Sequence, residues 1–439
     1  MFDMSDLIQP RVLKGFRDFL PEAEIGRTNL TEKITQVYRS FGFVPIDTPV
    51  LEYTEILLRK SNGETEKQVF RFEDNGGRDV ALRFDLTVPF ARFTAEHKNE
   101  LYFPFKRYHI AKVWRGEKPQ AGRYREFVQC DIDTVGSDSA AADFEILNVM
   151  KAALNGIGVE NITIHVNHRG IFNRFLANLD VSEKSEDILR SVDKLAKVGK
   201  EEVLKELNEF TGDEKKAEKI IEYISSKGTF EEILSKIETL AGGADSDTQR
   251  MRDIYEMMKA AGIEKTYVLD PSITRGLDYY TGVVYETFLN DLPSIGSVCS
   301  GGRYDNLAGL YMKEKVPGVG ASIGIDRLIA GLEQLGVFKS EGSYLDAEIY
   351  CLDAKNSIYY QKVAANLRSF GINVEVFPDA KKMAQQYAVT TAKGVKWGIM
   401  LGEDEIKSDT ISLKNLTNRE ISSGLTAEKA AEIIKAAKV

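Results

Sequence analysis

The clearest fold signal in this chain is the stretch FKRYHIAKVWRGEKPQAGRYREFVQCDIDTVG, residues 105–136. It holds two strand-like runs, FKRYHIAKVWRG and YREFVQCDIDTVG, joined by a loop with a Pro119–Gly122 turn. Two further strand-like runs, VFRFED and DVALRFDLTVP, precede it between residues 69 and 89. Consecutive strands with so few helices between them favour an antiparallel sheet over a doubly wound parallel one.

The same stretch is strongly basic. Between Lys106 and Arg125 it carries seven basic residues against one acid, Glu117. Paired guanidinium groups grip phosphates in a bidentate manner, so two basic strands joined by a basic loop suit an anion site. Trp114 and Phe127 lie beside these arginines and could stack on a nucleotide base. Taken alone, the run is more typical of a solvated charged hairpin than of an anion site.

Composition sets outer limits. The chain has 439 residues, of which 43% are hydrophobic and 28% charged, so we expect a globular protein of two or three domains. A net charge of −9 excludes a protein that coats nucleic acid without specificity. No apolar run is long enough to cross a membrane, and the N-terminal residues do not form a secretory signal. Three scattered cysteines match neither a disulfide scaffold nor a zinc site, which suits a reduced cytoplasm.

The composition and the pattern of predicted elements change twice along the chain. Residues 181–255 are rich in Glu, Lys and Leu and predict a helical insertion. From Ala347 onward, predicted strands and helices alternate as in a compact α/β domain, after the polar linker KSEGS. We therefore expect one large domain, residues 1–340, that contains the insertion, and a C-terminal domain, residues 341–439.

Two later motifs carry candidate chemistry. TRGLDYYTGVVYE, residues 274–286, brings an arginine, an aspartate and two adjacent tyrosines together. In a strand Tyr279 and Tyr280 would point to opposite faces, so one could line a pocket while the other packs; an aromatic strand core is the alternative. The Gly-rich segment 318–324 leads into a helix. Its glycines could serve close packing or could bind a phosphate at the start of that helix. The chain has no GxxxxGK[ST] phosphate loop.

Together these motifs resemble those of the class II aminoacyl-tRNA synthetases, and within them the histidyl-tRNA synthetase family. The resemblance spans nearly the whole chain and rests on KGFRDFLP, FGFVPIDTPVLEYTEIL (motif 1), WRGEKPQAGRYREFVQCDID (motif 2), GVGASIGIDR (motif 3), RGLDYYTG and CSGGRYDNL. It implies an α+β fold: an antiparallel sheet with flanking helices, a helical insertion, and a C-terminal α/β anticodon-binding domain. It also implies a cytoplasmic homodimer, formed through motif 1.

The resemblance assigns roles to individual residues. The catalytic residues would be Arg275, Arg115 and Arg327. ATP would contact Arg115, Glu117, Phe127 and Arg327. Phe127 would stack on the adenine ring, and Glu117 would bind the adenine amino group. Histidine would be bound by Asp85, Leu86, Thr87, Arg115, Gln129, Asp133, Arg275, Tyr279 and Tyr280. Lys118 and Gln120 would meet the tRNA acceptor end, and Glu286 is a candidate ligand for Mg²⁺, although an exposed strand glutamate explains it equally well.

The implied reaction is the ligation of L-histidine to tRNA(His), with ATP consumed to form histidyl-adenylate and pyrophosphate. Asp133 departs from the pattern, because many bacterial members carry glutamate there. The main alternative is a histidine-sensing regulatory subunit of ATP phosphoribosyltransferase, whose members usually lack the C-terminal domain and the catalytic arginines. Arg115, Arg275 and Arg327 are all present here and favour the enzyme. A synthetase for another amino acid is disfavoured by RGLDYYTG and CSGGRYDNL.

Overall fold

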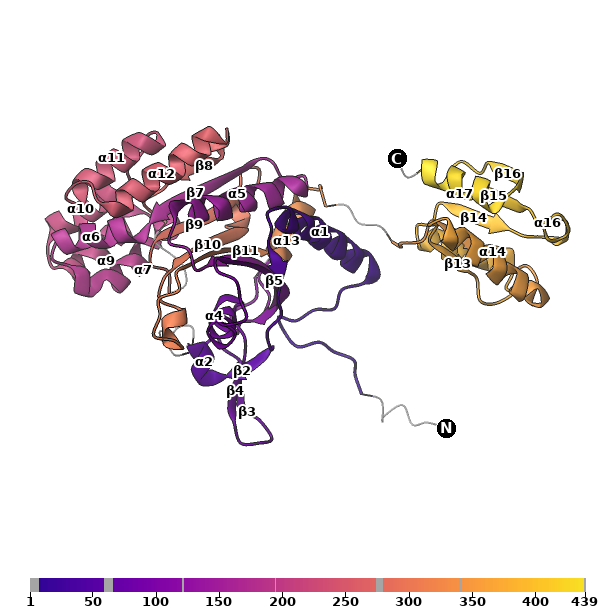
Figure 1. Cartoon of the computed structure of the whole chain (residues 1–439), viewed down its shortest axis with the longest axis horizontal. Helices are drawn as coiled ribbons and strands as arrows, with labels where there is room; N and C mark the ends of the chain where they lie inside the picture. The colour runs from indigo at the N-terminus through magenta and orange to yellow at the C-terminus, as the bar shows by residue number, and fades with distance from the viewer. Residues whose placement is uncertain are drawn as a thin grey trace. The chain divides into compact units, whose positions relative to one another are not determined.

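A computed structural model describes residues 8–58, 66–120, 122–193, 195–273, 279–338 and 342–437. The chain forms two compact units, which are described separately (Figure 1). The first holds the residues up to Arg17 and Leu30–Phe338, and the second holds Asp18–Asn29 and Lys339–Val439. Helix α1 spans Pro21–Ser40. Within the described residues, no helix is both long and apolar enough to cross a membrane.

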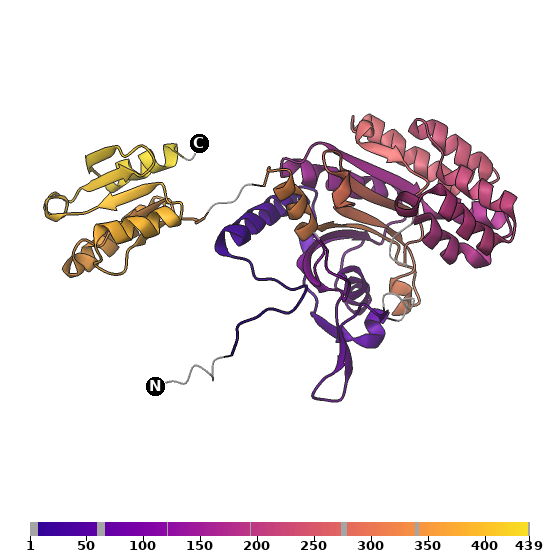
Figure 2. The same ribbon diagram turned by 180° about the vertical axis from the view of Figure 1, so that it is seen from behind.

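An eight-stranded sheet forms the centre of the first unit (Figures 1 and 2). In spatial order its strands are β1 (Val44–Pro45), β5 (Phe105–Trp114), β6 (Glu126–Val135), β11 (Gly318–Gly324), β10 (Cys299–Tyr304), β9 (Val283–Leu289), β7 (Ile162–His168) and β8 (Tyr267–Leu269). The six central strands pair antiparallel, and only β1 and β8 at the edges pair parallel. The antiparallel sheet predicted from residues 105–136 is confirmed.

Two sequence expectations fail locally. The runs VFRFED and DVALRFDLTVP do not join the main sheet; they supply β3 (Arg71–Glu73) and β4 (Asp79–Leu82) of a separate three-stranded sheet with β2 (Leu51–Tyr53). The second run is not one strand, because helix α4 begins at Thr87, and Pro89 is tolerated in its first turn. The short helix α2 spans Thr54–Leu58.

The Gly-rich segment that begins motif 3 is a strand. Residues 318–324 form β11, and helix α13 (Ile325–Gln334) follows at once. Close packing requires glycine at Gly320, where an added Cβ would lie 2.0 Å from Oδ1 of Asp133 on the neighbouring strand. The absent side chain therefore leaves room for a carboxyl group on the sheet surface.

The two faces of β6 have different functions. Cys130 and Ile132 point into the hydrophobic core, where they pack with helix α5 (Ala140–Gly156). The alternate residues Gln129, Asp131 and Asp133 lie on the opposite face, as the two-residue period of a strand requires. One face of the sheet thus holds the fold together while the other presents polar groups.

The helical insertion packs beside the β7 end of the sheet (Figures 1 and 2). Helix α6 (Arg169–Asn178) leads into it, and its own helices are α7 (Ser185–Asp193), α8 (Leu195–Val198), α9 (Lys200–Thr211), α10 (Glu214–Ile224), α11 (Phe230–Leu240) and α12 (Ser246–Ala260), the last of which continues five residues beyond the predicted end at 255. Thr229 and Asp245 begin the last two helices with capping boxes. The aromatic cluster of Phe172, Phe175 and Tyr223 joins α6 to α10.

The second unit is an α/β domain with its own core. Its five-stranded sheet has the order β13 (Val374–Val376), β12 (Ala347–Ile349), β14 (Trp397–Met400), β15 (Ile411–Asn415) and β16 (Ile421–Leu425). The helices are α14 (Ser357–Ser369), α15 (Met383–Ala392), α16 (Glu403–Ser408) and α17 (Ala427–Ala436). The predicted alternation of strands and helices after Ala347 is confirmed.

Candidate active site

A cavity of about 480 Å³ opens over the polar face of the main sheet. Most residues singled out in the sequence line it, namely Asp85, Thr87, Arg115, Glu117, Phe127, Gln129, Asp133, Tyr279, Tyr280, Glu286 and Arg327. Leu86 is fully buried and does not line the cavity, and Lys118 and Gln120 are exposed outside it. Arg275 lies outside the described residues. The fold therefore gathers residues from four separate stretches of the sequence (85–87, 115–133, 279–286 and 327) around one space.

The strand alternation expected for the tyrosine pair is wrong. Tyr279 and Tyr280 precede β9, which begins at Val283, so the alternation of a strand does not apply to them. Both line the cavity, with ring centroids 5.0 Å apart in an edge-to-face arrangement. The hydroxyl of Tyr279 donates a hydrogen bond of 3.1 Å to Oδ2 of Asp85.

Asp133 is held on both of its carboxylate oxygens. Tyr304 donates a 2.5 Å hydrogen bond to Oδ1, and Nη2 of Arg107 lies 2.6 Å from Oδ2. Arg107 is fully buried on β5 directly opposite Asp133. Burial raises the pKa of Asp133 to about 7, and the Arg107 guanidinium opposes that rise. A rigid carboxyl group that can accept or share a proton near neutral pH thus faces the cavity.

Asp131 is a cavity residue that the sequence analysis missed. It lies between Gln129 and Asp133 on the same face of β6 and is 2% exposed. Its Oδ1 atom has no hydrogen-bond partner among the described residues, and burial raises its pKa to about 6. The two-residue period of β6 was the available signal, because a residue midway between two site residues in a strand shares their face.

The floor of the cavity is acidic at this end. Asp85, the third buried carboxyl group, accepts a hydrogen bond of 3.1 Å from the backbone N–H of Val88. Burial raises the pKa of Asp85, which that hydrogen bond opposes. Gln129 donates a 2.7 Å hydrogen bond from Nε2 to Oγ of Ser322. Three buried carboxyl groups close to the Arg107 guanidinium favour a cationic ligand group here.

The other end of the cavity is cationic and aromatic. The Arg115 guanidinium lies 5.2 Å from the ring centroid of Phe127, and its Nε donates a 3.0 Å hydrogen bond to the carbonyl oxygen of Phe84. Arg327 donates from Nη1 to the carbonyl oxygen of Ser297 at 2.7 Å. Burial, with Arg123 and Arg115 close by, lowers the pKa of Arg327. Such a cluster suits a polyphosphate next to a planar base.

Comparison with known proteins identifies the family. The family model described as "Histidyl-tRNA synthetase" matches residues 15–328, and that described as "Anticodon binding domain" matches residues 346–437. The chain belongs to the histidyl-tRNA synthetase family.

Individual relatives agree with this assignment. A histidine–tRNA ligase of Treponema denticola is 62% identical, over 95% of this chain and 96% of that protein. The crystal structure of histidyl-tRNA synthetase from Nostoc covers 98% of this chain and 100% of its own, with a TM-score of 0.87 and 31% identity. A Bacillus halodurans structure titled as an ATP phosphoribosyltransferase regulatory subunit/histidyl-tRNA synthetase shares the fold at 22% identity, with a TM-score of 0.75 over 88% of this chain and 97% of that one.

Side chains that could bind a metal ion are the last feature of the site. Among the described residues, no group of three or more His, Cys, Asp or Glu side chains is arranged to hold an ion. Glu286 on β9 is one of the carboxylates that line the cavity. Mg²⁺ is commonly bound by one or two carboxylates together with substrate phosphates, so a single glutamate in a nucleotide cavity fits a metal that arrives with ATP.

Proposed function

We propose the following roles for the residues of this cavity in histidine–tRNA ligation. The chain activates L-histidine with ATP to give histidyl-adenylate and pyrophosphate, then transfers the histidyl group to the 3′ end of tRNA(His). One observation carries the proposal: a single cavity has an acidic end at Asp85, Asp131 and Asp133 and a cationic, aromatic end at Arg115 and Phe127. An amino acid with a cationic α-ammonium group fits the first end, and a nucleoside triphosphate fits the second.

At the acidic end, Asp133 and Tyr280 would bind the two imidazole nitrogens. Neutral imidazole presents one donor and one acceptor, and a carboxylate with a phenol can satisfy both. Tyr279 would close the side of the pocket. The α-ammonium group would be held by Asp85, Thr87 and Gln129. The adjoining Leu86 would act through the backbone, since its carbonyl oxygen accepts a 3.1 Å hydrogen bond from Arg107.

Asp131 would add its charge to this end. Asp131 lines the cavity between the Gln129 and Asp133 positions of β6, and its buried Oδ1 has no hydrogen-bond partner among the described residues, so it lies between the sites proposed for the ammonium and imidazole groups. A pocket that pairs both imidazole nitrogens should reject isosteres that lack them by roughly 10⁴-fold.

At the cationic end, Arg115 would bridge the α-phosphate of ATP and the carboxylate of histidine. Phe127 would stack on adenine, and Glu117 would accept a hydrogen bond from the adenine amino group. Arg327 would hold the γ-phosphate. Arg275 would stabilise the negative charge that grows on the α-phosphate as the histidine carboxylate attacks, which is the main help that phosphoryl-type transfer needs.

Mg²⁺ is part of this proposal. Glu286 would hold the metal together with the ATP phosphates, and the bound ion would neutralise negative charge on those phosphates. The variant Glu286→Gln should need a higher Mg²⁺ concentration for half-maximal activity at saturating ATP and histidine. An unchanged Mg²⁺ requirement would exclude Glu286 as a ligand.

The remaining partners follow from the family. Lys118 and Gln120, exposed at the tip of the motif 2 loop, would meet the acceptor end of tRNA(His). The C-terminal domain would bind the anticodon stem, as its family model implies. A cytoplasmic homodimer formed through motif 1 completes the proposal. A chain that sediments as a monomer and still has full exchange activity would contradict the homodimer.

The deciding experiment is ATP–pyrophosphate exchange with each of the twenty amino acids in turn. Only histidine should support exchange, and support by another amino acid instead would refute the specificity. Arg275→Ala should reduce exchange severely while histidine binding, measured by calorimetry, stays nearly unchanged. Loss of histidine binding together with the fold would show that Arg275 is structural. A purely regulatory protein would bind histidine without any exchange.

A further inference from the structure

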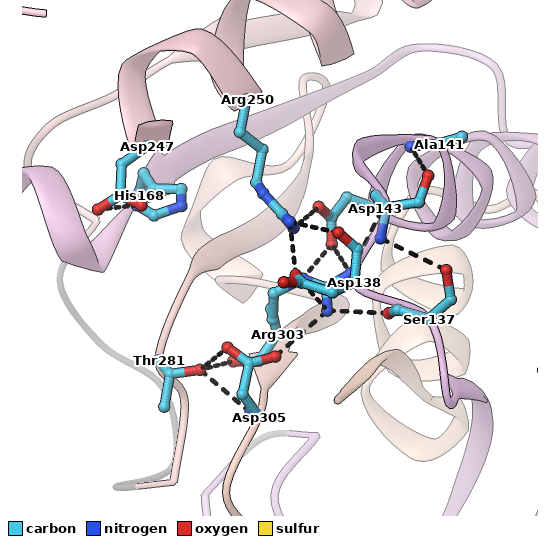
Figure 3. Close-up of polar contacts among 11 residues, drawn as sticks. Ser137, Asp138, Ala141, Asp143, His168, Asp247, Arg250, Thr281, Arg303 and Asp305 are labelled. Carbon is cyan, nitrogen blue, oxygen red and sulfur yellow. Dashed lines mark hydrogen bonds and ion pairs between the residues drawn. The ribbon is translucent and has the colours of Figure 1, made fainter. Parts of the chain in front are cut away.

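A buried ion network joins the last helix of the insertion to the body of the first unit (Figure 3). Its centre is Asp143 on α5, which is completely buried. Oδ2 of Asp143 accepts a 2.9 Å hydrogen bond from Nη1 of Arg250 on α12, and Oδ1 accepts one of 2.8 Å from Nε of Arg303 on β10. Arg250 also donates from Nη2 to the backbone oxygen of Asp138 at 2.7 Å. One carboxylate thus binds two arginines from opposite sides.

Arg303 extends the network to the segment that carries the tyrosine pair. Its backbone oxygen accepts a 2.8 Å hydrogen bond from the N–H of Thr281, and its Nη1 lies 3.3 Å from Oδ1 of Asp305. The Thr281 hydroxyl donates a 2.7 Å hydrogen bond to Oδ2 of the same aspartate (Figure 3). The Arg303 stem packs closely on Gly282, where an added Cβ would lie 3.0 Å from Cδ of the arginine.

Both ends of this connection adjoin the proposed imidazole pocket. Tyr280 directly precedes Thr281, and Tyr304, which donates to Asp133, directly follows Arg303. The backbone of Gly302 approaches the Tyr280 ring so closely that an added Cβ would lie 2.9 Å from it. A displacement of Arg303 would therefore move Tyr280 and Tyr304, the residues on two sides of the pocket.

We propose that Arg250 is a positioning residue for the histidine pocket, acting from the insertion through Asp143 and Arg303. The inference rests on the proposed function of the pocket, because it assigns the imidazole site to Asp133 and Tyr280. Arg250 itself is not among the residues that line the cavity. Its role is to fix one oxygen of a buried carboxylate, so that the other oxygen can hold Arg303 in the position on which both tyrosines depend.

The charge balance gives the physical reason. Removal of Arg250 leaves the buried Asp143 carboxylate with Arg303 as its main cationic partner, and a buried charge that has lost a partner either rearranges or takes up a proton. In either case the grip on Arg303 weakens. The residues proposed to hold adenine and the phosphates lie elsewhere: Arg115 directly follows β5, Phe127 is on β6 and Arg327 is on α13. Among the described residues, the hydrogen bonds of Arg115 and Arg327 go to the carbonyl oxygens of Phe84 and Ser297 and not to this network. The effect should therefore fall on histidine rather than on ATP.

The test uses the full-length chain and ATP–pyrophosphate exchange. Arg250→Met keeps the length of the side chain and removes its charge. We expect the KM for histidine to rise about tenfold, within the range of roughly 5- to 150-fold that coupling between sites usually shows, while the KM for ATP changes less than twofold. An unchanged KM for histidine, or an equal rise in both KM values, would overturn the inference.

Arg252→Met is the matched control. Arg252 lies two residues further along α12, and its Nη2 donates a 2.7 Å hydrogen bond to Glu238 within the insertion. This variant disturbs the same helix without touching Asp143, so both KM values should stay within twofold of those of the unchanged chain. A rise in its KM for histidine equal to that of Arg250→Met would show a general effect of insertion stability and overturn the specific role.

Two further variants keep the test decisive if Arg250→Met folds poorly. Arg250→Lys retains the charge but lacks the fork that spans Asp138 and Asp143, so we expect a smaller rise in the KM for histidine. Thr281→Val removes the hydroxyl bonded to Asp305. If the proposed path is correct, the Arg250→Lys and Thr281→Val effects on this KM will be non-additive in the double variant.

Additive effects of the two variants on the KM for histidine would overturn the path through Arg303.

The proposed function and the positioning role of Arg250 would be refuted by different results. Absence of histidine-dependent exchange in the unchanged chain would refute the proposed function. Normal exchange in the unchanged chain with an unaffected Arg250 variant would refute only the positioning role.

Discussion

The phenol of Tyr304 donates a 2.5 Å hydrogen bond to Oδ1 of Asp133, and both side chains are almost completely buried. The other oxygen of Asp133 faces the Arg107 guanidinium at 2.6 Å. These contacts hold the carboxyl group in place before any ligand arrives. In an enzyme that must recognise one imidazole ring, such preorganisation reduces the free energy spent on ordering the pocket when histidine binds.

Removing the Tyr304 hydroxyl should weaken histidine binding. In Tyr304→Phe the carboxyl group loses a hydrogen bond to a charged group worth about 1.5–3 kcal/mol, which corresponds to a rise of roughly 10- to 150-fold in the KM for histidine. The KM for ATP should change little, because the nucleotide end lies elsewhere in the cavity. Steady-state exchange kinetics measure both constants. An equal effect on both substrates would contradict the assignment of Asp133 to the histidine pocket.

Gly320 should tolerate no side chain. Gly320→Ala would place a Cβ 2.0 Å from Oδ1 of Asp133, so the carboxyl group or β11 must move. We expect the affinity for histidine, measured by calorimetry, to fall at least tenfold. Gly309→Ala is the matched control, since Gly309 has no atom within 4 Å of an added Cβ and does not line the cavity. Equal losses in both variants would rule out the steric explanation.

The pH dependence of stability should reveal the buried acid. Burial raises the pKa of Asp133 to about 7 from the ordinary value of 3.8, so the folded chain binds this proton more tightly than the unfolded chain. Its contribution to the free energy of unfolding therefore decreases as pH rises from about 4 to about 7.

Asp133→Asn cannot lose that proton. The Tm of this variant relative to the unchanged chain should therefore increase between pH 5 and pH 8, both measured without ligands by calorimetry. The buried residues His109 and His168 titrate in both chains, so their contributions cancel in the difference. A constant or falling difference in Tm would show that Asp133 is ionised throughout this range.

Arg115 should not be replaceable by lysine. Its Nε is fixed by the carbonyl oxygen of Phe84, which aims the rest of the planar guanidinium at the cavity, and an ammonium group cannot reproduce that fork. We expect Arg115→Lys to reduce kcat in exchange by roughly 10²–10³-fold, as the loss of one charge-stabilising donor typically does. Lys112→Ala, which removes an exposed ion pair with Glu126 on the same hairpin, should change kcat less than twofold. Comparable losses would indicate a general electrostatic effect.

Sequence patterns predicted the strands of one hairpin correctly but did not predict where neighbouring strands and helices begin and end. Residues 105–136 gave the right hairpin because their two-residue period and short turn act locally. The same kind of pattern misassigned residues 79–89, where a strand and a helix follow one another within eleven residues. The strand alternation expected for Tyr279 and Tyr280 fails for a related reason, since the sequence does not mark where β9 begins.

The sequence by itself determined the chemistry of the individual motifs: basic residues with an aromatic in 106–127, acids at alternate positions of β6, and glycines in β11. These properties are local, because side-chain type and strand period suffice to define them. Only the tertiary structure decided that Arg107 is buried against Asp133, that Asp131 faces the cavity, and that Arg250 shares Asp143 with Arg303. Those contacts join residues far apart in the chain, and they depend on strand order and helix packing, which no local pattern encodes.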